Sequence, residues 1–281
     1  MANLLFHLPA KLRAKLRAKL LRPLWLMLLL LPTSQLSAVE QSSPSKPLRI
    51  AVAANFAATL KILLADLPNK EQIELQIIGA ATGTIYQQIM HGAPFDLFLS
   101  ADATRPELLE QAGLIVADSR KTYAYGQIAL WSATKNITSL NVLNDYTQRL
   151  AIANPETAPY GKAAQQALAH LSLWQQLKNQ LITGINISQT FQQVRSQAVP
   201  LGIVAYSQLK VHQYQGLVIP AEYYQPIAQQ LVIIKSSQQV QLAKQISAFI
   251  LQTSSQEKLQ QLGYLAPASP ATISQAKAEN D

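Results

Sequence analysis

The sequence predicts an α/β protein with two lobes that face each other across one cleft. Apolar runs typical of buried strands alternate with helical patterns from residue 48 to residue 262. At four positions a helical pattern begins just after a strand or turn, two in each half of the chain: Asn55, Thr82, Tyr160 and Ile187. Mainly parallel sheets of this kind bind ligands beyond the carboxyl ends of their strands. We therefore expect one binding site that both halves share.

The first 38 residues are predicted to be an export signal peptide. They hold six Lys and Arg residues and no Asp or Glu, and a short apolar run over 24–31 precedes a polar stretch that ends at Ala38. That run is too short to span a bilayer by itself. A basic amphipathic helix on a membrane surface is the alternative for residues 11–22. We expect a periplasmic protein with a flexible N-terminal tail over residues 39–47.

Removal of the leader also removes most of the net charge. The formal charge of +8 falls to about +2, because 17 of the 23 Lys and Arg residues remain against 15 Asp and Glu. No basic patch with interleaved aromatics points to a nucleic-acid partner. The chain has no cysteine, which excludes disulfides, thiolate metal sites, cysteine nucleophiles and a lipidated cysteine.

The first half begins with two strand–helix units. Residues 48–54 form a continuous apolar strand, and Asn55 follows as the expected N-cap of a helix. Residues 75–78 form the second strand, and a turn of small residues with Thr82 leads to the next helix. Free backbone N–H groups at such a helix start, with a hydroxyl among them, can bind an anion. The alternative for Thr82 is that it only caps its helix.

A third strand lies within PFDLFLS, residues 94–100. Thr104 and Glu107 have the spacing of a capping box for the helix that follows. Asp96 and Asp102 flank the strand, and we expect them to cap or orient the turns at its two ends.

The rest of the chain continues the alternation. Strands are expected at residues 127–132, 149–153, 201–207, 217–220 and 227–234, and the last two helices at 240–251 and 256–262. The chain is expected to cross between lobes near residues 125–126 and 224–226. Lobe 1 then comprises residues 48–125 and 227–266, lobe 2 comprises residues 126–226, and residues 267–281 form a disordered tail.

The sequence carries no catalytic constellation that we can identify. The motifs GxSxG, GxxxxGK[ST] and GxGxxG are absent. The three histidines beyond the leader lie far apart, without the spacing of metal ligands: His91, His170 and His212. No pair of carboxylates lies at helical spacing near a strand end. A binding protein is therefore favoured over an α/β small-molecule enzyme.

Four segments carry a resemblance to a known family: AVAANF at the first strand, HGAPFDLFLSAD (91–102), ANPETAPYGKAAQQAL (153–168) and VPLGIVAYSQ (199–208). The chain resembles the periplasmic molybdate-binding proteins of ABC importers over about residues 48–265. The resemblance implies the two-lobed type II periplasmic binding-protein fold, a molybdate or tungstate oxyanion in the interlobe cleft, no cofactor, and a membrane permease as partner of a monomer. A sulfate-type or other oxyanion receptor on the same fold is the alternative.

The same resemblance implies the ligand contacts. Asn55 matches a Ser or Asn that binds the oxyanion, Thr82 matches a Ser, and Ile187 matches a Val that offers its backbone N–H. Tyr160 matches a position that is Ala or Tyr. Some members have a tyrosine directly after LGIV, where this chain has Ala205 with Tyr206 one residue later. A shift of one residue turns a strand side chain to the other face, so we expect Tyr160 to supply the phenol.

Overall fold

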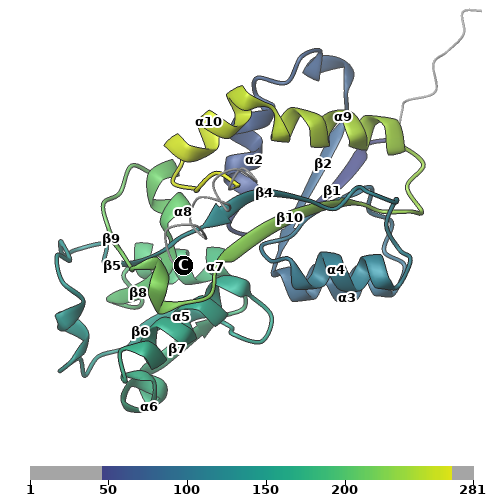
Figure 1. Cartoon of the computed structure of the whole chain (residues 1–281). Coiled ribbons are helices and arrows are strands. Elements are labelled where there is room, and N and C mark those ends of the chain that lie inside the picture. Colours follow the sequence, from purple (N-terminus) through teal and green to yellow (C-terminus); the bar gives the residue numbers. More distant parts are fainter. Residues whose placement is uncertain (1–45, 268–281) are drawn as a thin grey trace, which may run out of the picture. The chain divides into compact units, whose positions relative to one another are not determined.

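Two five-stranded sheets with helices packed on them carry the fold (Figure 1). The computed structural model describes residues 46–267, and both sheets belong to one compact unit of the chain. The predicted signal peptide and the predicted C-terminal tail beyond residue 267 lie outside the described residues. Within residues 46–267, no helix has the length and apolar character needed to cross a membrane.

Sheet 1 contains the first four strands and the last one. Its order is β2 (Leu75–Ala80), β1 (Leu48–Ala53), β3 (Leu97–Leu99), β10 (Ile227–Ile233) and β4 (Lys121–Gly126). Strand β1 is parallel to both of its neighbours, β2 and β3, whereas β10 is antiparallel to β3 and β4.

Sheet 2 repeats this arrangement with the middle of the chain. Its order is β7 (Leu181–Gly184), β6 (Leu150–Ala153), β8 (Leu201–Ala205), β5 (Ile128–Trp131) and β9 (Leu217–Val218). Here β6 is parallel to β7 and β8, and β5 is antiparallel to β8 and β9. Both sheets are therefore mixed, which refines the expectation of mainly parallel sheets.

Helices follow most of the strands. They are α2 (Ala57–Leu64), α3 (Thr82–Met90), α4 (Thr104–Gln111), α5 (Pro159–His170), α6 (Trp174–Leu177), α7 (Ile187–Arg195), α8 (Tyr206–Val211), α9 (Val240–Leu251) and α10 (Thr253–Gln261). Short 3-10 turns lie at residues 70–72, 140–143, 178–180 and 221–223.

The chain crosses between the sheets twice, near the positions that the sequence predicted. It leaves sheet 1 at the end of β4, Gly126, and enters sheet 2 at Ile128. It returns between β9 and β10, so that β10 lies beside β4 in sheet 1 (Figure 1). The two crossing segments are thus neighbours, and residues on β4 and β10 lie where the two halves meet.

Burial on both faces explains the continuous apolar strands. In β1, Leu48, Ile50 and Val52 belong to one apolar cluster and Ala51 belongs to another on the opposite face. Strand β6 divides in the same way between two clusters. Because side chains alternate along a strand, only an uninterrupted apolar sequence can fill both sides of a covered sheet.

Two of the predicted helix caps are wrong. Asn55 does not cap α2, whose N-cap is Phe56 with no side-chain bond, because the Asn55 amide is held by other side chains. The expected capping box of Thr104 and Glu107 is also not formed, since the N-cap of α4 is Ala103.

The carboxylates beside β3 act as the sequence predicted. Asp102 Oδ1 accepts the backbone N–H of Arg105 at 3.0 Å and so caps α4 in place of Thr104. Asp96 Oδ2 accepts the backbone N–H of Arg49 at 2.8 Å, and its Oδ1 accepts the hydroxyl of Ser237 at 2.6 Å. Both side chains orient turns at the ends of the strand.

Candidate ligand-binding site

The structure brings the four predicted site residues together around one small cavity. Asn55 and Thr82 come from sheet 1, and Tyr160 and Ile187 come from sheet 2. The cavity is small, with a volume of about 10 Å³, which is room for roughly one water molecule. All four side chains are almost fully buried, with at most 3% of their surface exposed. A guest in this cavity would be largely removed from water.

Free backbone donors gather at this cavity. Thr82 and Ile187 are the first residues of α3 and α7, and Tyr160 is the second residue of α5. Among residues 46–267 we find no protein acceptor for the backbone N–H of these three residues or of Asn55. Such helix-start N–H groups have no partner within the helix and carry its positive dipole end. They supply a concentrated set of neutral donors.

The Thr82 hydroxyl can add a donor to this set. Its Oγ1 accepts the backbone N–H of Ala101 at 3.1 Å, which leaves its own hydrogen unassigned. The alternative that Thr82 only caps α3 is wrong, because the N-cap is Ala81 and no side chain caps this helix.

The Tyr160 hydroxyl can also donate a hydrogen bond into the cavity. Its oxygen accepts from Asn55 Nδ2 at 3.2 Å and from Gln229 Nε2 at 3.3 Å, and an amide NH₂ group cannot accept in return. The phenolic hydrogen is therefore free. Burial raises the pKa of Tyr160 well above 10.0, with smaller contributions from neighbouring tyrosines. Because the phenol stays neutral at physiological pH, it remains a hydrogen-bond donor.

The Asn55 side chain is bound to protein rather than free for a ligand. Its Nδ2 also donates to Gln229 Oε1 at 2.8 Å, and its Oδ1 is buried without a partner among the described residues. With both amide hydrogens used, Asn55 can offer a ligand its backbone N–H. The sequence placed Asn55 at the site but gave no sign of this network.

Tyr206 does not line the cavity. It is the first residue of α8 and packs against an apolar cluster that contains Trp131 and Phe191. Of the two tyrosines considered for a phenol contact, Tyr160 is the one at the cavity. Its role as a ligand contact remains a prediction.

Two further hydrogen bonds, both to main-chain carbonyls, join the halves beside the cavity, and the sequence did not reveal them. Gly83 donates its backbone N–H to the carbonyl of Thr157 at 2.9 Å, and Ser188 Oγ donates to the carbonyl of Ala54 at 2.9 Å. A Cβ at Gly83 would lie 3.1 Å from the Thr157 oxygen, closer than most side-chain contacts. Glycine at this position lets the two halves approach each other.

No charged side chain lines the cavity. Arg105 and Lys162 lie in a neighbouring hollow, and Arg105 is paired with Asp102 at 2.5 Å. The cavity thus offers hydrogen-bond donors without a formal positive charge.

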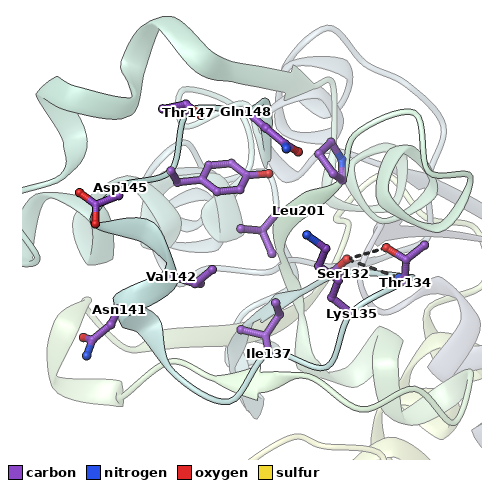
Figure 2. Close-up of a pocket in the computed structure, with 12 residues that line it drawn as sticks. Ser132, Thr134, Lys135, Ile137, Asn141, Val142, Asp145, Thr147, Gln148 and Leu201 are labelled. Carbon is purple, nitrogen blue, oxygen red and sulfur yellow. Dashed lines mark hydrogen bonds between the residues drawn. The ribbon is translucent and has the colours of Figure 1, made fainter.

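A larger hollow lies in the half formed by sheet 2, and Figure 2 shows the residues that line it. Leu201 is the first residue of β8, and Ser132 follows the antiparallel β5, so this hollow lies at the amino ends of the parallel strands. The helix starts with free N–H groups are at the opposite, carboxyl ends. Its charged lining residues, Lys135 and Asp145, are exposed. The hollow therefore lacks the buried donors of the smaller cavity.

The family is settled by comparison with known proteins. Residues 48–265 match the model of the bacterial extracellular solute-binding proteins. The chain belongs to this family. Its members are binding proteins, in agreement with the absence of catalytic motifs from the sequence.

Curated relatives of this solute-binding protein span nearly its whole folded part. It is 37% identical to the molybdate-binding protein ModA of Azotobacter vinelandii over 223 residues, which cover 77% of this chain and 88% of that protein. It is 35% identical to the molybdate-binding protein ModA of Rhodobacter capsulatus, with 76% and 86% covered.

A solved structure agrees with the fold. The periplasmic molybdate-binding protein of Azotobacter vinelandii matches this solute-binding protein with a TM-score of 0.75 and 33% identity, over 79% of this chain and all of that one. This likeness confirms the predicted two-sheet periplasmic binding-protein fold. Among the described residues, no group of three or more His, Asp or Glu side chains could hold a bare metal ion.

A substitution at Gly126 tests the position of the Tyr160 side chain. A Cβ on Gly126 would lie 2.2 Å from Tyr160 Oη, so we expect Gly126→Ala to displace Tyr160 and to lower the free energy of unfolding. Overpacking of this kind costs about 1–3 kcal/mol. Urea unfolding measures the change. Gly79→Ala is the matched control, because its Cβ would meet Ala57 at an ordinary 3.4 Å. Equal stability of both variants would contradict the placement of Tyr160.

Proposed function

We propose that this protein captures molybdate, and also tungstate, in the periplasm and delivers it to an ABC importer. The observation that carries the proposal is the buried cavity lined by neutral donors from both sheets and by no charged side chain. The molybdate-binding relatives at 37% and 35% identity support the choice of ligand.

Neutral donors suit a fully deprotonated tetrahedral dianion. Each hydrogen bond to a charged group contributes about 1.5–3 kcal/mol, and each helix start adds about 0.3–1 kcal/mol. Four backbone N–H groups and two hydroxyls together can offset the desolvation of the ion. Because the donors are fixed at helix starts, they also fix the distance at which the anion oxygens are held, which favours anions of one size.

The remaining parts of the proposal concern transport. The N-terminal 38 residues act as the export signal, and the mature protein works as a monomer. The two sheets with their helices act as lobes joined at the crossings near Gly126 and Pro226, and they close on the anion. The bonds from Gly83 to Thr157 and from Ser188 to Ala54 support this closure, because they join the lobes beside the cavity. A membrane permease then recognises the closed form.

A panel of oxyanions tests the ligand. We expect molybdate and tungstate to raise the melting temperature of the purified mature protein and to bind tightly in calorimetric titration. We expect sulfate and phosphate to bind far more weakly, because donors spaced for the larger ion hold smaller ones poorly. The alternative function, a sulfate-type receptor, predicts the opposite order. Sulfate binding as tight as molybdate binding would therefore overturn the proposed selectivity.

Thr82 tests the hydroxyl donors. Thr82→Val removes the hydroxyl at nearly constant volume. The binding free energy for molybdate should therefore weaken by the contribution of one hydrogen bond to a charged group, about 1.5–3 kcal/mol. Thr82→Ser keeps both the hydrogen and the acceptor for Ala101 and should bind within about threefold of the original protein. Calorimetry measures both variants. Unchanged affinity in Thr82→Val would remove Thr82 from the site.

The affinity for molybdate should not change with pH between about 7 and about 9. No group in the cavity titrates in this range, since burial raises the pKa of Tyr160 above its ordinary value of 10.0 and so keeps the donor hydrogen in place. Only above that value would deprotonation put a negative charge beside the anion and weaken binding. Titrations at several pH values, in buffers that do not bind molybdate, measure this. A clear loss of affinity by about pH 9 would show that an ionisable group takes part.

A further inference from the structure

Gln229 lies at the meeting point of the two halves, outside the set of residues that line the cavity. It is on β10, the strand by which the chain returns to sheet 1, and its side chain is fully buried. Its Oε1 accepts from Asn55 Nδ2 at 2.8 Å, and its Nε2 donates to Tyr160 Oη at 3.3 Å. One amide thus contacts a cavity residue from each sheet.

These two bonds determine where the Tyr160 hydrogen can point. Because Gln229 Oε1 holds the NH₂ group of Asn55, the same NH₂ group also faces Tyr160 Oη, at 3.2 Å. The phenol oxygen therefore meets only donors from Asn55 and Gln229. Its own hydrogen must turn away from both and is available to a guest in the cavity.

Asn55 Oδ1 is an acceptor that could compete with a guest for the Tyr160 hydrogen, so the orientation of the Asn55 amide matters. Asn55 Oδ1 is buried and has no partner among the described residues. If the Asn55 amide turned over, Oδ1 would take the place of Nδ2 opposite Tyr160 Oη and would accept the phenolic hydrogen. Gln229 Oε1 opposes this turn, because the turned amide would bring two acceptor oxygens together.

Tyr123 and Gly126 support Gln229 from the neighbouring strand β4. The Tyr123 hydroxyl can donate its single hydrogen to Gln229 Oε1, at 3.2 Å, or to the carbonyl of Ser100, at 3.1 Å. At Gly126 the missing side chain leaves room for both partners, since a Cβ there would lie 2.2 Å from Tyr160 Oη and 3.2 Å from Gln229 Nε2. The strands at both crossings therefore hold this contact in place.

We propose that Gln229 is a positioning residue that keeps the Tyr160 hydroxyl hydrogen directed at the bound oxyanion. It does not touch the guest itself and acts through Asn55 and Tyr160. The inference rests on the proposed oxyanion function and adds to it a residue from β10, the strand by which the chain returns to sheet 1.

A double-mutant cycle tests this role on the mature protein, with molybdate as the probe. Gln229→Leu should weaken binding at least about tenfold, because the Tyr160 hydrogen is then free to bond Asn55 Oδ1. In the Tyr160→Phe background there is no hydrogen to direct, so the same substitution should change affinity by no more than about twofold. Calorimetry gives the four dissociation constants, and circular dichroism confirms that each variant is folded.

Gln230→Leu is the matched control. Gln230 is the next residue of β10 and bonds to Thr122 and Arg120, so its replacement should leave the affinity unchanged. If Gln229→Leu does not fold, Gln229→Met replaces it, because methionine adapts to irregular core space.

The results of these experiments distinguish a failure of the proposed Gln229 role from a failure of the proposed molybdate-binding function. Equal losses of affinity for Gln229→Leu with and without the Tyr160 hydroxyl would show a merely structural role and overturn the proposal, as would unchanged affinity in Gln229→Leu. Absence of molybdate binding by the unsubstituted protein would instead overturn the proposed function.

Discussion

The structure depends on one constraint: a buried polar group must find a partner. Beside the cavity, the buried polar side chains of the protein find these partners in one another. Asn55, Gln229 and Tyr160 are joined by hydrogen bonds, with Tyr123 beside Gln229, and only Asn55 Oδ1 of this set is left without a partner among the described residues. Each bond is modest in net energy, but an unmade one costs about 1–3 kcal/mol inside the protein. The set therefore fixes the directions of the side chains more than it adds stability, and it leaves unpaired the groups that a ligand can use.

The same constraint explains why the site needs both sheets. A single sheet could present donors from two strand–helix junctions, as sheet 1 does at Asn55 and Thr82. Two such junctions alone would leave a guest exposed to solvent on its other side, where water competes for every hydrogen bond. With Tyr160 and Ile187 brought from sheet 2, the donors surround the space and exclude water. Electrostatic interactions are stronger in such surroundings than in water.

Much of the fold could be predicted, because local patterns reflect local physics. Continuous apolar strands such as residues 48–53 follow from burial on both faces, and helix α9 was placed correctly over residues 240–251. The four cavity residues were found because each stands at a strand–helix junction. Side-chain partners were not predictable in this way. Asn55 and Thr104 have the residue types of helix caps, but Asn55 is bound to Gln229, 174 positions away, and Asp102 takes the place of Thr104. Gln229 lies within a strand and has no sequence signal of its own.

The contacts between the two halves have a consequence for how the sequence can vary. Both acceptors, at Ala54 and Thr157, are main-chain carbonyls, which every amino acid possesses. Replacing either side chain therefore leaves the acceptor in place. The donor position at residue 83 is more restricted, because a Cβ there would lie 3.1 Å from the Thr157 oxygen and the Thr157 backbone would have to shift by a few tenths of an ångström. Substitution is thus tolerated less easily on the donor side of this contact than on the acceptor side.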